Sequence, residues 1–137
     1  MIALLDTDVL IDVALDRQPF SNDSAAVLMP RNAVSFKRLL PGIPLPISII
    51  LFLRHLEKTT KAFISDLLEF VDIAPTQTAQ AKRALQLDLP DFEDALQVVA
   101  ATSAGADFIV TRNLKHYQKS PVPAISPADF FQKLTAK

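Results

Sequence analysis

The sequence contains no cysteine and only two glycines, Gly42 and Gly105, among its 137 residues. Without cysteine the chain forms no disulfides, thiolate metal sites or cysteine nucleophile. The scarcity of glycine argues against a glycine-rich phosphate-binding loop, which makes a generic small-molecule-binding α/β domain the weakest functional interpretation. A chain without thiols suits a reducing cytoplasm, where we expect the protein to work.

Long apolar runs are missing as well. The most apolar stretch, Ile43 to Leu53, is too short to span a bilayer and contains two prolines. The start of the chain, MIALLDTDVLIDVALD, carries acids within and after its apolar run and lacks the basic start of a signal peptide. We therefore expect a soluble protein with no membrane partner.

A surplus of positive charge is also absent. The formal net charge is −1, which argues against a general polyanion binder, because nonspecific affinity for nucleic acids comes mostly from clustered lysine and arginine. A local basic patch is left where Arg112, Lys115, His116 and Lys119 occur close together. A nucleic-acid contact and a solvated surface loop explain this patch equally well.

Half of the residues are apolar and 21% are charged, so we assign residues 1–137 to a single globular domain. Short apolar runs alternate with segments of helical periodicity. Strands that alternate with helices pair in parallel, with helices on both faces, so the pattern predicts an α/β fold with a central parallel sheet. The predicted strands are Ile2–Leu5, Val71–Ile73, Phe108–Val110 and Val122–Ile125, and the predicted helices cover 8–15, 21–28, 59–70, 76–87, 91–104 and the segment after Ser126.

Three groups of polar residues fall at one predicted edge of this sheet. The DTD group at residues 6–8 follows the first strand, the DFED group at 91–94 opens a helix, and the TRN group at 111–113 follows the strand Phe108–Val110. Ligands of an open parallel sheet bind beyond the carboxyl ends of its strands. Asp91 and Asp94 are three residues apart and so lie on one face of their helix.

Grouped carboxylates repel and raise one another's pKa unless a cation lies between them. Mg²⁺ and Mn²⁺ prefer carboxylate oxygens and need only one or two protein carboxylates together with substrate phosphate. Such an ion activates water for cutting a phosphodiester bond, which needs neither cysteine nor histidine. The three groups therefore indicate a divalent metal site for phosphodiester cleavage.

Each residue also has a purely structural interpretation. Asp6 can be a simple strand-end aspartate, Asp91 is an excellent helix N-cap, and Asp94 in the first turn favours the helix dipole. Asn113 is an ordinary loop residue by default, and Glu93 is expected to point to solvent. The two histidines have no partner at metal-ligand spacing. What favours the functional interpretation is that groups far apart in sequence converge on one edge.

The start, LLDTDVLIDVALDRQPF, and the end, which includes DLPDFEDALQVVAA and IVTRNLKHY, resemble the PIN-domain family, in particular the toxins of bacterial toxin–antitoxin pairs. The resemblance covers about residues 1–28 and 56–134. It implies a three-layer α/β/α fold and a metal-dependent endoribonuclease. It further implies a homodimer that cuts RNA and is silenced by an antitoxin protein.

The resemblance assigns roles to individual positions. Asp6 matches the family's first metal-binding acid, and Asp94 matches the acid at the start of the late helix, with Asp91 beside it. Thr111 matches a small hydroxyl residue near the metal-bound water. Asn113 stands where many members have an acid, so this ligand is a neutral acceptor here. The implied catalytic set is Asp6, Asp91, Asp94 and Asn113, and the three aspartates would bind Mg²⁺ or Mn²⁺.

The family also has a polar residue, often glutamate, in a helix between these acids, and residues 29–53 offer none. This departure leaves two functional interpretations open. The first is a cytoplasmic, Mg²⁺- or Mn²⁺-dependent ribonuclease toxin. The second is a catalytically inactive PIN-like module that binds RNA or a protein partner.

Residues 29–53 are anomalous in a second way, because they contain four prolines, no acid and no sustained period. Both flanks match the family, and the match resumes abruptly at Arg54. Reading the codons of residues 28–51 in a shifted frame, with undetermined bases left free, permits the translation NAAECGKLQAFTSWHSLTNLYYI. This translation runs helix, strand and helix, as the family does here. We therefore predict that the segment is a translation in the wrong reading frame.

Overall fold

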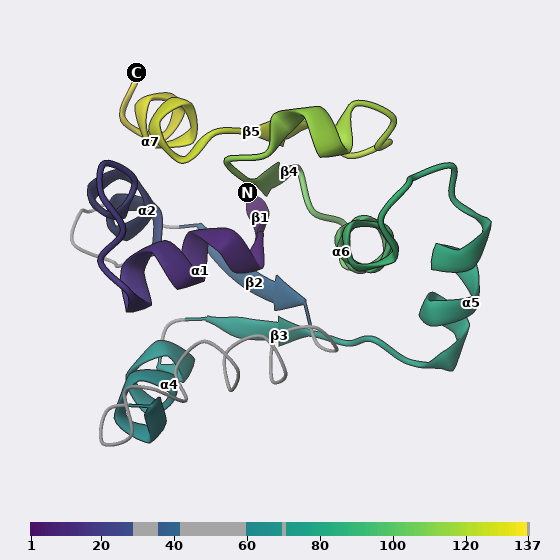
Figure 1. Ribbon diagram of the computed structural model, residues 1–137, viewed down its shortest axis with the longest axis horizontal. Coiled ribbons are helices and arrows are strands. Elements are labelled where there is room, and N and C mark those ends of the chain that lie inside the picture. The colour runs from purple at the N-terminus through teal and green to yellow at the C-terminus, as the bar shows by residue number, and fades with distance from the viewer. Residues whose placement is uncertain (29–35, 42–59, 70, 137) are drawn as a thin grey trace.

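The computed structural model describes residues 1–28, 36–41, 60–69 and 71–136. Its strands form one parallel sheet in the order β3-β2-β1-β4-β5 (Figure 1). The strands are β1 (Ile2–Leu5), β2 (Lys37–Pro41), β3 (Asp72–Ala74), β4 (Phe108–Val110) and β5 (Ala124–Ile125). The helices are α1 (Thr7–Ala14), α2 (Ser21–Leu28), α4 (Thr60–Leu68), α5 (Thr78–Gln86), α6 (Phe92–Ser103), α7 (Pro127–Thr135) and the 3-10 helix η1 (Leu114–Tyr117).

Strand β1 lies at the centre of the sheet, between β2 and β4. Its Leu4 lies opposite Leu39 of β2 and Ile109 of β4. Ala3 and Leu5 pack into the core on one face, whereas Leu4 packs into the core on the other. These three side chains are completely buried and Ile2 is partly buried, as expected of a strand covered on both faces.

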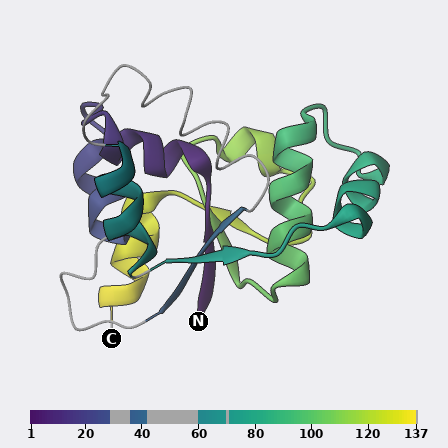
Figure 2. The same cartoon turned by 90° about the horizontal axis from the view of Figure 1, so that it is seen from below.

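Helices cover both faces of the sheet and produce three layers. One core joins the sheet to α1, α4 and α7 through Val9, Leu67 and Phe130, with α2 in the same layer. The opposite core joins it to α6 through Val98 and Ala101, and α5 packs against α6. Figures 1 and 2 show α1, α2, α4 and α7 grouped on one side and α5 and α6 on the other. The predicted α/β/α fold is confirmed.

Most of the predicted elements are confirmed. β1, α2 and β4 have the predicted bounds. Helix α6 begins after its N-cap Asp91 and ends before Gly105, whose φ of +67° is the left-handed conformation typical of a glycine just past a helix. No helix in the described ranges is both long and apolar enough to cross a bilayer.

Several details differ from the prediction: β3 lies one residue later than predicted, and α4 and β5 are shorter. Helix α1, predicted to begin at Asp8, begins at Thr7 with Asp6 as its N-cap, because Asp6 is still extended (φ −60°, ψ 144°) and its carboxylate accepts from the backbone N–H of Asp8. Helix α5 begins two residues later than predicted, where the Gln80 side chain accepts from the Gln77 N–H at 2.9 Å. Residues 114–117, which lie between the predicted strands and helices, form η1.

Strand β2 lies inside the segment for which the sequence predicts no structure. It pairs in parallel with β1 and β3 and ends at Pro41, which has no N–H to donate to a ladder. Residues 29–53 are also the segment predicted to be frame-shifted. Apart from β2 and Phe36, they lie outside the described residues.

Candidate active site

Asp6 lies at the carboxyl end of the central strand. Its backbone N–H donates to the carbonyl of Val110 at 2.9 Å, which continues the β1–β4 ladder by one residue, and α1 begins immediately afterwards. The side chain is only 4% exposed. A short apolar strand followed at once by a helix therefore holds a carboxylate inside the molecule at the functional edge of the sheet.

The Asp6 carboxylate is held by uncharged donors. Its Oδ2 accepts from the Thr111 hydroxyl at 2.7 Å and lies 3.2 Å from the Tyr117 hydroxyl, and Gln97 also contributes a side-chain hydrogen bond. Burial raises the pKa of Asp6, and the charge of Asp8 raises it further, while the hydrogen bonds from Thr111 and Gln97 lower it. Among the described residues no basic side chain pairs with Asp6, so its charge is left without a counter-ion.

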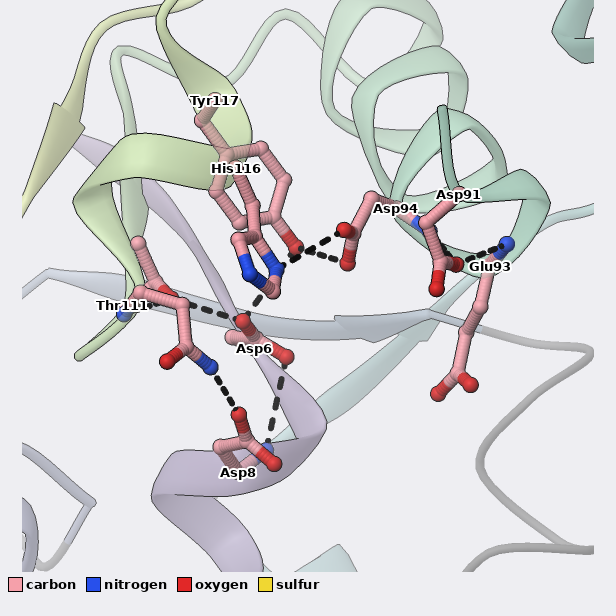
Figure 3. A network of polar contacts seen from close by, with 9 residues as sticks. Asp6, Asp8, Asp91, Glu93, Asp94, Thr111, His116 and Tyr117 are labelled. Atoms are coloured by element: carbon pink, nitrogen blue, oxygen red, sulfur yellow. Dashed lines mark hydrogen bonds and ion pairs between the residues drawn. The ribbon is translucent and has the colours of Figure 1, made fainter. Parts of the chain in front are cut away.

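Asp94 lies in the first turn of α6, where Asp91 sets the start of the helix. One oxygen of Asp91 accepts from the backbone N–H of Glu93 at 2.8 Å and of Asp94 at 3.2 Å. Asp94 then contacts η1 through both its oxygens, with the Tyr117 hydroxyl at 3.2 Å and His116 Nδ1 at 3.1 Å (Figure 3). Burial and then the charge of Asp91 raise the pKa of Asp94, and His116 opposes that rise.

The residues after β4 complete the site. Thr111 is completely buried, and its hydroxyl oxygen accepts from the backbone N–H of Asn113 at 3.0 Å while donating to Asp6. The Asn113 amide donates to the carboxylate of Asp8. Asn113 therefore bonds to Asp8 of α1 and not to Asp6. The Asp6 carboxylate bonds to Thr111.

Tyr117 is the residue that connects the two central acids. Its hydroxyl lies 3.2 Å from Asp6 Oδ2 and 3.2 Å from Asp94 Oδ1 (Figure 3). Burial and the two carboxylates raise the pKa of this hydroxyl far above its usual value, so it stays protonated. Asp6 and Asp94 therefore lie on either side of one neutral hydrogen-bond donor.

Sequence reasoning overlooked part of this arrangement. His116, for which the sequence offers no partner at metal-ligand spacing, pairs with Asp94. Glu93 is exposed as predicted, and its partial desolvation and the nearby aspartates raise its pKa. Gln97 follows Asp94 by one helical turn, so helical spacing could have indicated it. Tyr117 has no such signal, because η1 sets its position. Within the described ranges, no three Asp, Glu or His side chains are gathered as a ready-made metal cluster.

A groove with a volume of about 490 Å³ adjoins the acids. Residues 87–90, before α6, form one wall, and the other wall includes Lys115, His116 and Lys119. His116 also pairs with Asp94, so one side chain contacts both the groove and the acidic cluster. Lys115, His116 and Lys119 of the basic patch noted in the sequence thus line this groove, whereas Arg112 lies elsewhere and pairs with Asp12.

Comparison with known proteins agrees with this architecture. VapBC2 from Rickettsia felis, solved bound to a DNA fragment from its promoter, contains a similar fold with a TM-score of 0.67 and 14% sequence identity. The alignment covers 92% of this chain and 98% of that one. No curated protein sequence matches significantly. The family model of the PIN domain matches residues 3–115, most of the chain, and the protein therefore belongs to the PIN-domain family.

Proposed function

We propose that this protein is a divalent-metal-dependent endoribonuclease. The observation that carries the proposal is the Asp6 carboxylate, which is buried, has a raised pKa and has no basic partner among the described residues. A buried carboxylate without a counter-ion is costly unless a cation binds beside it. Asp94 faces Asp6 across one hydroxyl and supplies the second charge such a cation requires.

The residues present fit Mg²⁺ or Mn²⁺. The side chains that could bind an ion here, Asp6, Asp91 and Asp94, offer carboxylate oxygens. Hard divalent cations prefer carboxylate oxygen and retain several waters. Asp6 and Asp94 would bind the ion directly, with Asp91 beside them. When bound, the ion supplies an activated water and stabilises charge on phosphorus.

The chain's own residues prepare the site for RNA. The Thr111 hydroxyl fixes the rotamer of Asp6, and His116 does the same for Asp94. Asn113 ties the loop after β4 to α1 through Asp8. Lys115 and Lys119 line the adjoining groove and would contact the phosphates of a single-stranded RNA, with Lys119 exchanging its exposed pair with Asp88 for a phosphate.

The biological setting follows from the family and its structural neighbour. We propose a cytoplasmic toxin that works as a homodimer and is silenced by an antitoxin protein. Support comes from the similar fold of the VapBC2 chain, which was solved with promoter DNA. Copurification of the chain with a protein encoded beside it would test the antitoxin, and sedimentation would test the dimer.

A catalytically inactive PIN-like module that binds RNA or a protein is the second candidate. Asn113 stands where many family members have an acid, and its amide donates a hydrogen bond to Asp8. The described residues also hold no preassembled cluster of three metal ligands. In this alternative the groove still binds RNA while the acids no longer support cleavage.

One experiment separates the two functions. Purified protein is incubated with 5′-labelled single-stranded RNA and Mn²⁺, and parallel reactions use Asp6→Asn, Asp94→Asn and the control Asp66→Asn, which changes an exposed acid on α4. The ribonuclease proposal requires cleavage by the wild type and the control and its loss in both site variants. Binding without cleavage by the wild type would favour the inactive module.

A further inference from the structure

Tyr117 does more than fill the core between η1 and the sheet. The residue is 3% exposed and packs with Leu4 of β1 and Val98 of α6. Its carbonyl accepts from the backbone N–H of Ser120 at 3.0 Å, which fixes the end of η1. Ring and backbone are thus held independently of the acids, so the position of the hydroxyl is set by the fold.

That hydroxyl is a single donor placed between two acceptors. It has one proton, yet it lies 3.2 Å from an oxygen of Asp6 and 3.2 Å from an oxygen of Asp94. Both distances exceed the usual oxygen–oxygen distance of about 2.7–2.8 Å in an O–H···O hydrogen bond. The hydroxyl is therefore not committed to either carboxylate. It acts as a fixed spacer between them.

We propose that Tyr117 is a positioning residue that couples Asp6 and Asp94 into one cation-binding unit. The hydroxyl sets the separation and rotamers of the two carboxylates, so that one divalent ion engages both at once. This inference rests on the proposed metal site, but it concerns a residue without a charge of its own. Thr111 is different in kind, since its hydroxyl contacts only Asp6 of the two acids.

The first test removes the hydroxyl alone. Tyr117→Phe keeps the ring in its core position, and the affinity for Mn²⁺ is measured by electron paramagnetic resonance without RNA. Loss of a residue that orients metal ligands weakens binding about 10- to 100-fold, and we expect a decrease in this range. The control Thr102→Val removes a hydroxyl elsewhere on α6, where it donates to the Val98 carbonyl, and should bind Mn²⁺ as the wild type does.

The outcomes are distinct. Equal Mn²⁺ affinity for wild type and Tyr117→Phe would overturn the inference and leave the metal site standing. No Mn²⁺ binding by the wild type would overturn both. A thermal unfolding curve shows whether Tyr117→Phe is folded, and if it is not, the second test below decides with Tyr117 intact.

The second test uses a property of the composition. The chain has one tyrosine and no tryptophan, so its near-UV absorbance above the phenylalanine bands and its tyrosine emission come from Tyr117 alone. Because these signals depend on the hydrogen bonds of the phenol, Asp6→Asn and Asp94→Asn should each change the spectrum of the metal-free protein. Saturating Mg²⁺ should change that of the wild type. A spectrum that responds to only one of the two substitutions, or that stays fixed while calorimetry detects Mg²⁺ binding, would overturn the coupling.

Discussion

The guanidinium of Arg112 holds the carboxylate of Asp12 through two hydrogen bonds, from Nε at 2.6 Å and from Nη2 at 3.0 Å. Asp12 is completely buried in α1, and its Oδ2 also accepts from the Ser24 hydroxyl of α2 at 3.2 Å. The guanidinium carbon lies 4.0 Å from the centre of the Phe20 ring. Through Asp12, Ser24 and Arg112, α1 and α2 are joined to the loop that carries Thr111. The ion pair therefore holds in place a loop that contributes to the site.

We predict that Arg112→Ala destabilises the protein by about 3–5 kcal/mol, because it leaves the Asp12 carboxylate buried without its partner. The free energy of unfolding is measured with urea. The control is Asp88→Asn, which breaks an exposed pair with Lys119 and should leave the unfolding midpoint unchanged. Equal urea midpoints for wild type and Arg112→Ala would show that the buried pair contributes nothing.

The raised pKa of Asp6 predicts a pH-dependent effect of Asp6→Asn on metal-free protein. Folding favours the protonated form of a carboxyl whose pKa is raised above its ordinary value of 3.8, so the stability it contributes falls as pH rises through that pKa. Asp6→Asn has no such loss. The difference in melting temperature between Asp6→Asn and the wild type should therefore be small near pH 3.5, and at pH 7 the variant should be the more stable protein. Thermal unfolding in EDTA measures both values. An advantage that shrinks as pH rises would contradict the cause assigned to the shift.

We predict weak binding of Mg²⁺ in the absence of RNA. Two or three carboxylates leave most of the coordination shell of the ion to water and to substrate phosphate. Calorimetry should give a dissociation constant above the micromolar range, and millimolar Mg²⁺ should raise the melting temperature of the wild type more than that of Asp6→Asn. Tight binding without RNA would show that the chain supplies more ligands than the proposal assigns.

The basic wall of the groove predicts a salt-dependent contact with RNA. The double variant Lys115→Glu, Lys119→Glu should bind single-stranded RNA more weakly. It should also lower the slope of log affinity against log salt by about 1.4, since each phosphate contact contributes about 0.7. The double variant Lys61→Glu, Lys82→Glu, with exposed changes on α4 and α5, is the charge-matched control. A slope that stays the same in the double variant would place the RNA elsewhere.

The proposed change of reading frame predicts that β2 carries residues unsuited to its place. Arg38 is 8% exposed, and its guanidinium donates to the carbonyls of Val27 at 2.9 Å and Phe36 at 3.4 Å. Burial lowers the pKa of Arg38, and the described residues provide it with no carboxylate. The shifted translation reads Ala-Phe across this position, which suits an inner strand.

Two measurements test this proposal. Resequencing the gene should reveal paired frame changes around codons 28 and 52, and the intact mass of the natural protein should differ from that of the printed sequence. A mass that agrees to within a dalton would rule out an error of reading. In the protein as printed, Arg38→Met should raise the urea midpoint, because it replaces a buried charge that has no carboxylate partner among the described residues with an apolar side chain.

The parts of the fold that were predicted are those with strong local patterns. Strands β1 and β4 are apolar runs buried on both faces, and α6 has a capping aspartate at one end and Gly105 at the other. Strand β2 was missed because KRLLP has neither alternation nor β-branched residues, and its pairing with β1 and β3 determines its structure. At the site, the placement of Asp6 and Asp94 followed from topology, whereas His116 and Tyr117 depend on a 3-10 turn that no periodicity announces.

The sheet order has a consequence for how the protein is made. Asp6 meets Thr111, which is 105 residues away along the chain, and Tyr117, which is 111 residues away. A nascent chain therefore cannot form the contacts of Asp6 until residue 117 has been synthesised, because Thr111 and Tyr117 follow β4 near the end of the chain. Contacts of such long range also form late in folding. A site built in this way is therefore complete only when most of the chain has been synthesised, whatever reaction it carries out.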